Sequence, residues 1–459
     1  MRKLAPLLLG MTTAAVAQTP PPPADLPLLD SLGRAPSAAN IERDVRTLVG
    51  FGTRHTLSDT ASPTRGIGAA RRWVFDEFTR ISKACGGCLE VRYISGTVQG
   101  EPRIPGPVEV VSVIAIQRGS VDPNRYVMMS GDIDSRASDV MDATSDAPGA
   151  NDNASGLAGT LEAARVLSRH RFAGSIVYAA LSGEEQGLYG GKFLAEEAKR
   201  QGWRIEAVLN NDMIGNTRGI DGIHDNVTAR VFSEGTRATE TPEEARARRF
   251  TGGELDSPSR NLARYIARMA DHVPNLAVMM VNRMDRFGRG GHHRPFNELG
   301  YPAVRVMEAH EHYDRQHQDV RTETDAQGRT RVYGDTIDGV DFPYAAKLTA
   351  LNVVTLAALA SAPPPPADVR IEGAVSADTT LRWKRPPAAQ AANLAGYRVY
   401  WRLTTDPQWA RSRWVGDVET ATLENTVIDD YFFGVSAVAK DGSESPVVFP
   451  GAAGSFGGH

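Results

Sequence analysis

Residues 149–187 read GANDNASGLAGTLEAARVLSRHRFAGSIVYAALSGEEQG, and this stretch decides the fold class. Apolar residues recur three or four apart, as at Leu157 and Leu161, with charged residues between them, which predicts an amphipathic helix over 155–170. A short apolar run over 175–181 follows and predicts a buried strand. A polar turn, a helix, a strand and a second polar turn in this order indicate an α/β layer fold.

The same alternation continues on both sides of this stretch. Helical spacing predicts further helices over 69–82 and 343–360, the second with a proline in its first turn. Short runs rich in Val, Ile and Met predict strands over 108–116, 126–130, 206–211, 277–281 and 302–307. We therefore predict one α/β domain over residues 35–361.

A proline run ends this domain, and the pattern then changes. Residues 362–366 are predicted to be a linker, and residues 367–450 a separate all-β module. Its alternating strands are expected at 380–383, 397–401 and 431–439. Trp383, the strand around Tyr397 and Tyr431 resemble a fibronectin type III sandwich.

The first residues of the chain predict export. A basic start at Arg2 and Lys3, an apolar stretch and the small residues Ala15-Val16-Ala17 indicate a signal peptide over residues 1–17. The apolar stretch is too short to cross about 30 Å of hydrocarbon, so no transmembrane segment is expected. Residues 18–34 are predicted to be a proline-rich spacer. The chain is thus expected in a periplasm or outside the cell.

Composition narrows the possible functions further. The 459-residue chain is 41% hydrophobic and 23% charged, and its net charge of −4 gives no attraction for polyanions. Nucleic acid is therefore not an expected partner. The only cysteines, Cys85 and Cys88, are predicted to close a small structural disulfide in an exported protein.

Carboxylates follow the ends of several predicted strands. In an open α/β sheet, ligands bind in the crevice beyond the carboxyl ends of the strands. The carboxylates come in the order Asp132 and Asp134, Asp152, Glu184 and Glu185, and Asp212, with His317 beyond the last predicted strand of the domain.

Each of these turns also has a plainer interpretation. Asp132 and Asp134 can mark a solvated turn, Asp152 can cap a helix, and adjacent glutamates often begin one. Five turns with such side chains in one domain nevertheless favour a metal cluster. Of the two adjacent glutamates, one can bind a cation while the other accepts a proton from water.

Three blocks carry a resemblance to a known family. GANDNASG at 149–156, SGEEQGLYGG at 182–191 and NDMIG at 211–215 resemble metallopeptidase family 28, the co-catalytic zinc aminopeptidases that also include glutaminyl cyclases. The resemblance covers residues 40–361 and implies a mixed, mainly parallel sheet between helices. It also implies two zinc ions, bridged by Asp152 and bound singly by Glu185 and Asp212, with Glu184 as the general base.

Two segments depart from the family pattern. Where the family has His-x-Asp, this chain has Asp132-Ile133-Asp134, so Asp132 is the expected ligand and Asp134 the expected catalytic partner. A carboxylate ligand makes magnesium, calcium or manganese an alternative to zinc in that half-site.

The second departure concerns the histidines. His317 is assigned as the closing ligand, with His310 and His312 as alternatives. The segment GGHHRPF at 290–296 resembles the substrate-side Asp-His-x-x-Phe segment of the family, with His292 in place of its aspartate. His293 is accordingly expected beside the substrate.

These features predict a secreted metal-dependent aminopeptidase that acts on peptides, with Glu184 as general base. Two alternatives remain open. The first is a one-metal cyclase or a carboxypeptidase-like hydrolase on the same fold. The second is an inactive binding protein whose β module contacts a surface or a polymer.

Overall fold

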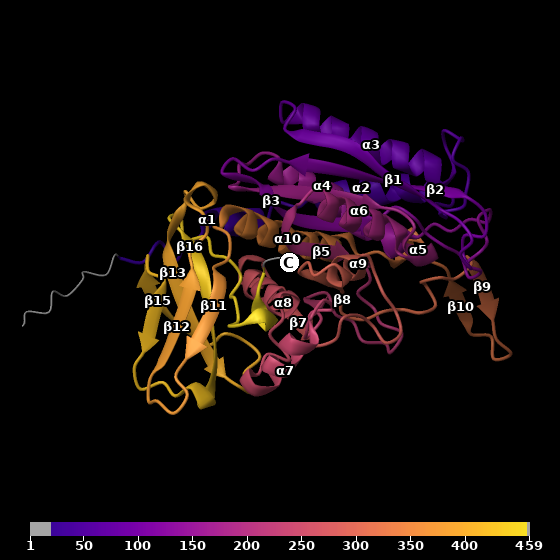
Figure 1. Cartoon of the computed structure of the whole chain (residues 1–459). Coiled ribbons are helices and arrows are strands. Elements are labelled where there is room, and N and C mark those ends of the chain that lie inside the picture. The colour runs from indigo at the N-terminus through magenta and orange to yellow at the C-terminus, as the bar shows by residue number, and fades with distance from the viewer. Residues whose placement is uncertain (1–19, 457–459) are drawn as a thin grey trace, which may run out of the picture.

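The computed structural model describes residues 20–456, so the predicted signal peptide lies outside the described residues. An eight-stranded sheet with the order β1-β2-β4-β3-β5-β8-β6-β7 forms the centre of the larger domain (Figure 1). Its strands are β1 (Leu89–Val98), β2 (Val108–Gln117), β3 (Asp122–Asp132), β4 (Gly174–Leu181), β5 (Arg204–Asn211), β6 (Thr228–Phe232), β7 (Ala277–Val281) and β8 (Ala303–Glu308). The pairs β3–β4, β3–β5, β5–β8 and β6–β7 are parallel, whereas β1–β2, β2–β4 and β6–β8 are antiparallel. The prediction of a mixed, mainly parallel sheet is confirmed.

Helices cover both faces of this sheet, as the alternation of side chains along β4 shows. Ile176 and Tyr178 face one core, and Val177 and Ala179 face the other. The larger core is closed by α2 (Ala38–Val49), α3 (Gly66–Ala84), α4 (Gly156–Leu167), α8 (Pro258–Met269) and α10 (Phe342–Ser361). The smaller is closed by α6 (Tyr189–Arg200) and α9 (His293–Glu298). The short helices α1 (Pro27–Leu32), α5 (Glu184–Gly187) and α7 (Pro242–Thr251) complete the set.

Helix α10 is apolar on every side because it runs through the larger core. Among the described residues it is the one helix long and apolar enough to span a membrane, and most of it is buried within the protein. A helix that is hydrophobic all round is typical of such a buried position.

The sequence located most of these elements but misjudged two boundaries. The predicted helix over 155–170 starts close to the expected residue but is too long, because α4 ends at Leu167; a π-type turn, Ala150–Ser155, comes directly before it. The predicted spacer over 18–34 is too long, because Leu29 and Leu32 of α1 are buried in the larger core.

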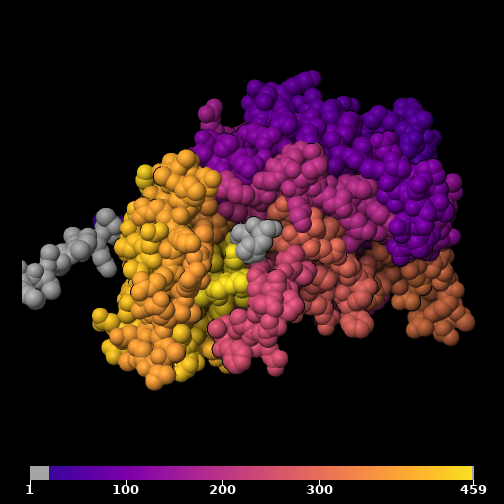
Figure 2. Space-filling view, viewed as in Figure 1, coloured from indigo at the N-terminus to yellow at the C-terminus, as the bar shows by residue number. Residues whose placement is uncertain are grey.

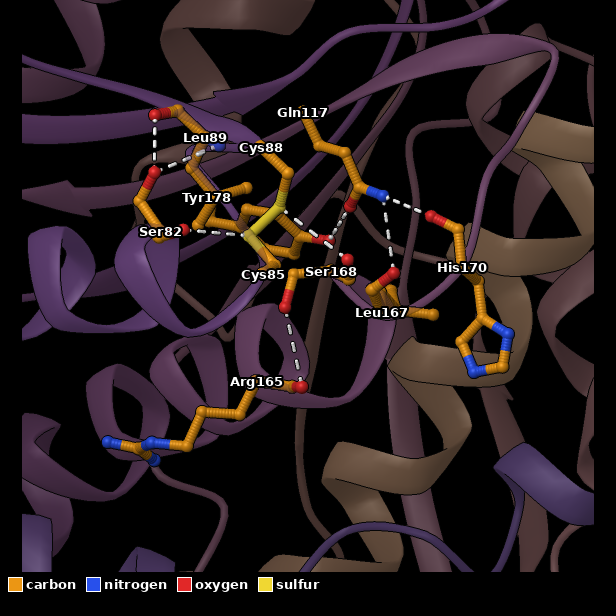
Figure 3. The surroundings of a disulfide bond; sticks show 10 residues. All are labelled: Ser82, Cys85, Cys88, Leu89, Gln117, Arg165, Leu167, Ser168, His170 and Tyr178. Atoms are coloured by element: carbon orange, nitrogen blue, oxygen red, sulfur yellow. Dashed lines mark hydrogen bonds between the residues drawn. A yellow bond between two sulfur atoms is a disulfide. The ribbon is translucent and has the colours of Figure 1, made fainter.

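The predicted disulfide is present where α3 turns into β1 (Figure 3). The Cα atoms of Cys85 and Cys88 are 5.6 Å apart. Beside them the Ser82 hydroxyl donates to the carbonyl of Leu89 at 2.8 Å and accepts from its amide at 3.1 Å. The covalent bond and these two hydrogen bonds fix the same turn.

Residues beyond the proline linker form the predicted all-β module. One antiparallel sheet has the order β11-β12-β15 and the other β14-β13-β16. Trp383 and Tyr397 lie in the core between them. The strands are β11 (Ala367–Glu372), β12 (Thr379–Lys384), β13 (Leu394–Leu403), β14 (Arg411–Gly416), β15 (Thr420–Leu423) and β16 (Tyr431–Ala439).

The β module packs against the larger domain through buried polar contacts, and Figure 2 shows the two surfaces in close contact. The buried carboxylate of Asp256 accepts from Arg264 of α8 at 2.9 Å and from Arg402 of β13 at 2.9 and 3.0 Å. Tyr265 also donates to the carbonyl of Glu444 at 2.9 Å. Because a buried charge stripped of its partner is costly, these contacts hold the module in place.

Two small strands, β9 (Arg321–Thr324) and β10 (Thr330–Tyr333), form a hairpin that follows the loop carrying His317.

Candidate metal centre

Neighbouring strands deliver their carboxylates to one edge of the sheet. β3 ends at Asp132, β4 ends just before Glu184, and β5 ends just before Asp212. Because β3, β4 and β5 run parallel, these ends lie side by side. A cleft of about 540 Å³ opens there, lined in part by Asp152, Glu184, Glu185, Asp212 and His317.

Three of these residues converge on one point. Ligand atoms of Asp152, Glu185 and His317 all lie within 4.8 Å of one another. His317 Nε2 is 3.0 Å from Asp152 Oδ2 and 2.9 Å from Glu185 Oε1. Two carboxylates and an imidazole form a donor set typical of a zinc site with an open position. We call this group the open half-site, and its residues fit one zinc ion.

The charges of His317 and of the two carboxylates in the open half-site shift each other's pKa values. Burial lowers the pKa of His317, but Glu185 and Asp152 outweigh it and raise that pKa to about 10. Burial raises the pKa of Asp152, but its hydrogen bond and attraction to His317 bring that pKa well below the usual range. The two carboxylates therefore favour a positive charge at this point. The alternatives His310 and His312 belong to no such group.

Two further aspartates hold the open half-site from behind. Asp335 accepts from the backbone amides of Asn151 at 2.8 Å and Asp152 at 2.6 Å. Asp134 accepts from the amides of Glu184 at 3.2 Å and Glu185 at 3.1 Å. Asp134 was predicted to be catalytic, but it is buried away from the cleft lining and orients the two glutamates instead.

Glu184 lines the cleft next to the open half-site. Burial raises its pKa well above the usual range, and the negative charges of Glu185 and Asp212 raise it further. A carboxylate in such surroundings attracts protons strongly, which is the property a general base requires.

The remaining carboxylates lie in a second group, which we call the filled half-site: Asp132, Asp212, His292 and Arg305. Asp132 Oδ1 is 2.5 Å from His292 Nδ1, and its Oδ2 accepts from Asn153 at 2.7 Å. The fully buried Arg305 forms an ion pair with Asp212. Arg305 also contacts Asp285 at 3.0 Å.

The filled half-site does not fit a second zinc ion. Asp132 and Asp212 were predicted to be metal ligands, but both oxygens of Asp132 already have partners, and the guanidinium of Arg305 neutralises Asp212. Asp212 Oδ1 and His292 Nε2 have no hydrogen-bond partner, yet no third ligand atom of the described residues gathers with them as in the open half-site.

His293 does not lie where the sequence predicted. Its side chain is fully buried and is absent from the lining of the cleft, so it does not face a substrate. Its Nε2 lies 3.0 Å from the Met284 carbonyl and 3.5 Å from Asp285. Because Asp285 also pairs with Arg305, His293 supports the filled half-site from outside.

Sequence reasoning missed Arg305 and Asp335. Arg305 had a visible signal, because it is the one charged residue within the apolar run over 302–307. A charge inside a buried strand requires a partner, and the strand-end carboxylates were the available ones. Asp335 lies in an irregular segment beyond the β9–β10 hairpin and carried no comparable signal.

The fold and this strand-end centre are those of an α/β metallohydrolase. The profile of Peptidase family M28 matches residues 112–333. A probable zinc metalloprotease of Leptosphaeria maculans is 44% identical over 416 residues, which cover 90% of this chain and 94% of the relative. One of Pyricularia oryzae is 42% identical and covers 96% of this chain and 90% of the relative. The chain belongs to peptidase family M28.

A solved structure shows the same fold at low sequence identity. The LapA aminopeptidase of Legionella pneumophila matches with a TM-score of 0.53 and 18% identity, over 78% of this chain and 77% of that chain.

Proposed function

We propose that this protein is an exported, zinc-dependent aminopeptidase with one zinc ion, held by Asp152, Glu185 and His317. The observation that carries the proposal is the convergence of these three side chains within 4.8 Å beside Glu184 in an open cleft. Membership of a peptidase family and relatives named probable zinc metalloproteases support the peptide as substrate and zinc as the metal.

A bound zinc ion supplies the Lewis acidity that polarises a scissile carbonyl. Glu184 takes a proton from the attacking water and delivers it to the leaving amine, so that one residue acts in both halves of the reaction. Asp134 keeps Glu184 and Glu185 in register by binding both backbone amides. The carboxylates at the metal-centre end of the cleft, Glu184 among them, attract the free α-amine of a peptide, which favours cleavage at the amino terminus.

The filled half-site limits the zinc content to one. A guanidinium stays protonated at all physiological pH values and cannot leave the protein, so Arg305 neutralises Asp212 permanently. Asp212, to which the family resemblance assigns a metal, therefore has an internal counter-ion in this protein.

A second candidate function rests on this one-metal arrangement. A cyclase that converts an amino-terminal glutamine needs a general base and one Lewis acid, which the open half-site and Glu184 would also provide. Release of ammonia from glutaminyl peptides would distinguish this activity from hydrolysis.

Export and the role of the β module complete the proposal. A disulfide in a chain with only two cysteines is typical of an oxidising compartment, which agrees with the predicted signal peptide. We propose that the β module is a fibronectin type III-like domain and that its function is to contact a surface or a polymer.

The test is hydrolysis of aminoacyl anilides and of amino-blocked and glutaminyl peptides by the full chain, with zinc measured on the same samples. We expect cleavage of free amino termini only, and a loss of about 10²- to 10⁴-fold in kcat for Glu184→Gln with zinc retained. Glu196→Gln, on the exposed side of α6, is the matched control. Cleavage of blocked peptides, or no cleavage with any divalent metal, would overturn the aminopeptidase assignment.

A further inference from the structure

The cleft that holds the open half-site is rich in cationic side chains. Among the 17 described residues that line it, only Leu188 and Pro295 are apolar. Six are cationic, namely Arg103, Arg136, Lys192, Arg286, Arg289 and Arg294. Five are carboxylates, namely Asp152, Glu184, Glu185, Asp212 and Glu298, so the charge of the cleft depends on where the two kinds of side chain lie. A part of a cleft in which one sign of charge prevails concentrates ligands of the opposite sign.

Not all of these cations are available to a ligand. Arg286 and Arg289 are both held by Glu311, at 2.9 and 3.1 Å. Arg136 donates to the carbonyls of Ala137 and Ser138. These three side chains shape the wall of the cleft and have few donors left over.

The other three cations have donors to spare. Lys192 lies over the ring of Tyr189 at 4.7 Å, and Arg103 donates to the backbone carbonyl of Glu185 at 2.6 Å. Among the described residues, these contacts are with a ring and a backbone carbonyl, and neither side chain forms an ion pair with a carboxylate. Arg294 has only a loose contact of 3.6 Å with the exposed Glu298, and its own side chain is 36% exposed. We call Arg103, Lys192 and Arg294 the cationic rim.

The carboxylates of the cleft do not cancel the rim. Asp152 and Glu185 face His317 and the zinc that they would hold, and Asp212 is paired with Arg305. Glu184 lies beside the open half-site, and Glu298, which contacts Arg294 at 3.6 Å, is largely exposed to solvent. The part of the cleft away from the metal centre therefore has a positive charge.

We propose that the cationic rim binds a carboxylate of the substrate, so that the enzyme prefers anionic peptides. This inference rests on the proposed function, because it names the substrate class for the same cleft. The lack of apolar lining agrees with it, since a preference for large apolar residues needs an apolar pocket. The carboxylate has two sources: an acidic side chain on the terminal residue, or the free carboxyl terminus of a short peptide.

The experiment compares kcat/KM for matched pairs of substrates with the zinc-loaded full chain. Glutamyl, glutaminyl and lysyl anilides test the side chain, and dipeptides with free or amidated carboxyl termini test the chain end. We expect the anionic member of at least one pair to be preferred about tenfold or more, as for a charge-assisted hydrogen bond. Raising the ionic strength should reduce that preference, because the rim is solvent-accessible.

Variants link the preference to the rim. The variant that combines Lys192→Met and Arg294→Met should show a ratio of kcat/KM between anionic and neutral substrates about tenfold below that of the parent. Lys199→Met is the matched control, since Lys199 lies on the same helix α6 and is exposed outside the cleft. Its ratio should equal that of the parent.

Each outcome has a distinct meaning. Preference for glutamyl over glutaminyl anilide identifies the acidic side chain, and preference for the free over the amidated dipeptide identifies the chain terminus. Equal hydrolysis of both members of both pairs, or an unchanged ratio in the double variant, overturns the cationic rim while the aminopeptidase assignment stands. No hydrolysis of any substrate overturns the proposed function itself.

Discussion

The open and the filled half-sites lie at the same edge of the same sheet, yet they satisfy their carboxylates differently. In the open half-site the cationic partner of Asp152 and Glu185 is an imidazole on a loop, His317. In the filled half-site the partner of Asp212 is Arg305, which lies on β8 directly beside Asn210 of β5. An imidazolium can release its proton and then share its carboxylates with a metal, whereas a guanidinium keeps its proton and can only replace the metal. The identity of the resident cation therefore separates a functional half-site from a structural one.

The largest expected effect is loss of the metal from the open half-site. His317→Ala removes one of three ligands, so zinc content should fall from about one ion per chain to nearly none, and hydrolysis should be lost with it. Elemental analysis after gel filtration measures this. His310→Ala should keep both zinc and activity, because this imidazole pairs with Asp221 at 3.3 Å and is not part of the open half-site. Retention of zinc in His317→Ala would contradict the assignment of the open half-site.

Arg305→Met tests the filled half-site through stability. The substitution leaves Asp212 and Asp285 buried without their common partner, which should lower the free energy of unfolding by about 3–5 kcal/mol. Urea denaturation of metal-free protein measures it. The exposed pair Arg246–Glu243 provides the control, because Arg246→Met should cost less than about 1 kcal/mol. Equal effects of the two substitutions would show that Arg305 does not stabilise this region.

Sequence and structure agree best where periodicity carries the information. The predicted strand over 175–181 and helix over 343–360 correspond to β4 and α10, because burial on both sides requires apolar runs of those lengths. β1 was missed since it is an edge strand in which exposed polar residues such as Glu90 interrupt the pattern.

At the site, the motif blocks supplied Asp152 and Glu185, and His317 was assigned separately as the nearest imidazole; the structure places the three side chains together. They could not show that Asp132 and His292 pair with each other, because the partners are 160 positions apart. Nor could they show that Arg305 points at Asp212, because the direction of a buried charge depends on the register of β5 and β8.

His293, which supports the filled half-site, should make the stability of the protein depend on pH. Burial lowers the pKa of His293 to about 4, below the value near 6.5 of an unfolded chain. Because the pKa of His293 is lower in the folded protein than in the unfolded chain, burying the neutral imidazole is not penalised above pH 6.5. As the pH falls towards 4, the free energy of unfolding should decrease by about 3 kcal/mol. Thermal melts of metal-free protein between pH 4 and 7 measure this. His293→Gln should lose less stability over that range, and an equal loss would contradict the explanation.

The smallest expected effect concerns Asp134, which orients the glutamates from behind. In Asp134→Asn the new amide group can no longer accept from both backbone amides, so Glu184 loses its fixed position. We expect kcat to fall about tenfold with zinc content unchanged, as for other residues behind a metal site. A fall in zinc content equal to that in activity would instead make Asp134 part of the metal-binding group.

The most direct test of the account is the number of zinc ions per chain. The purified full chain would be stripped of metal, titrated with zinc in a calorimeter, and checked by elemental analysis and native mass spectrometry. The account predicts one tight site, which disappears in His317→Ala and persists in Asp212→Asn. Two tight sites in the parent, one of them lost in Asp212→Asn, would show that Arg305 yields its place to a metal and would contradict the distinction between the half-sites.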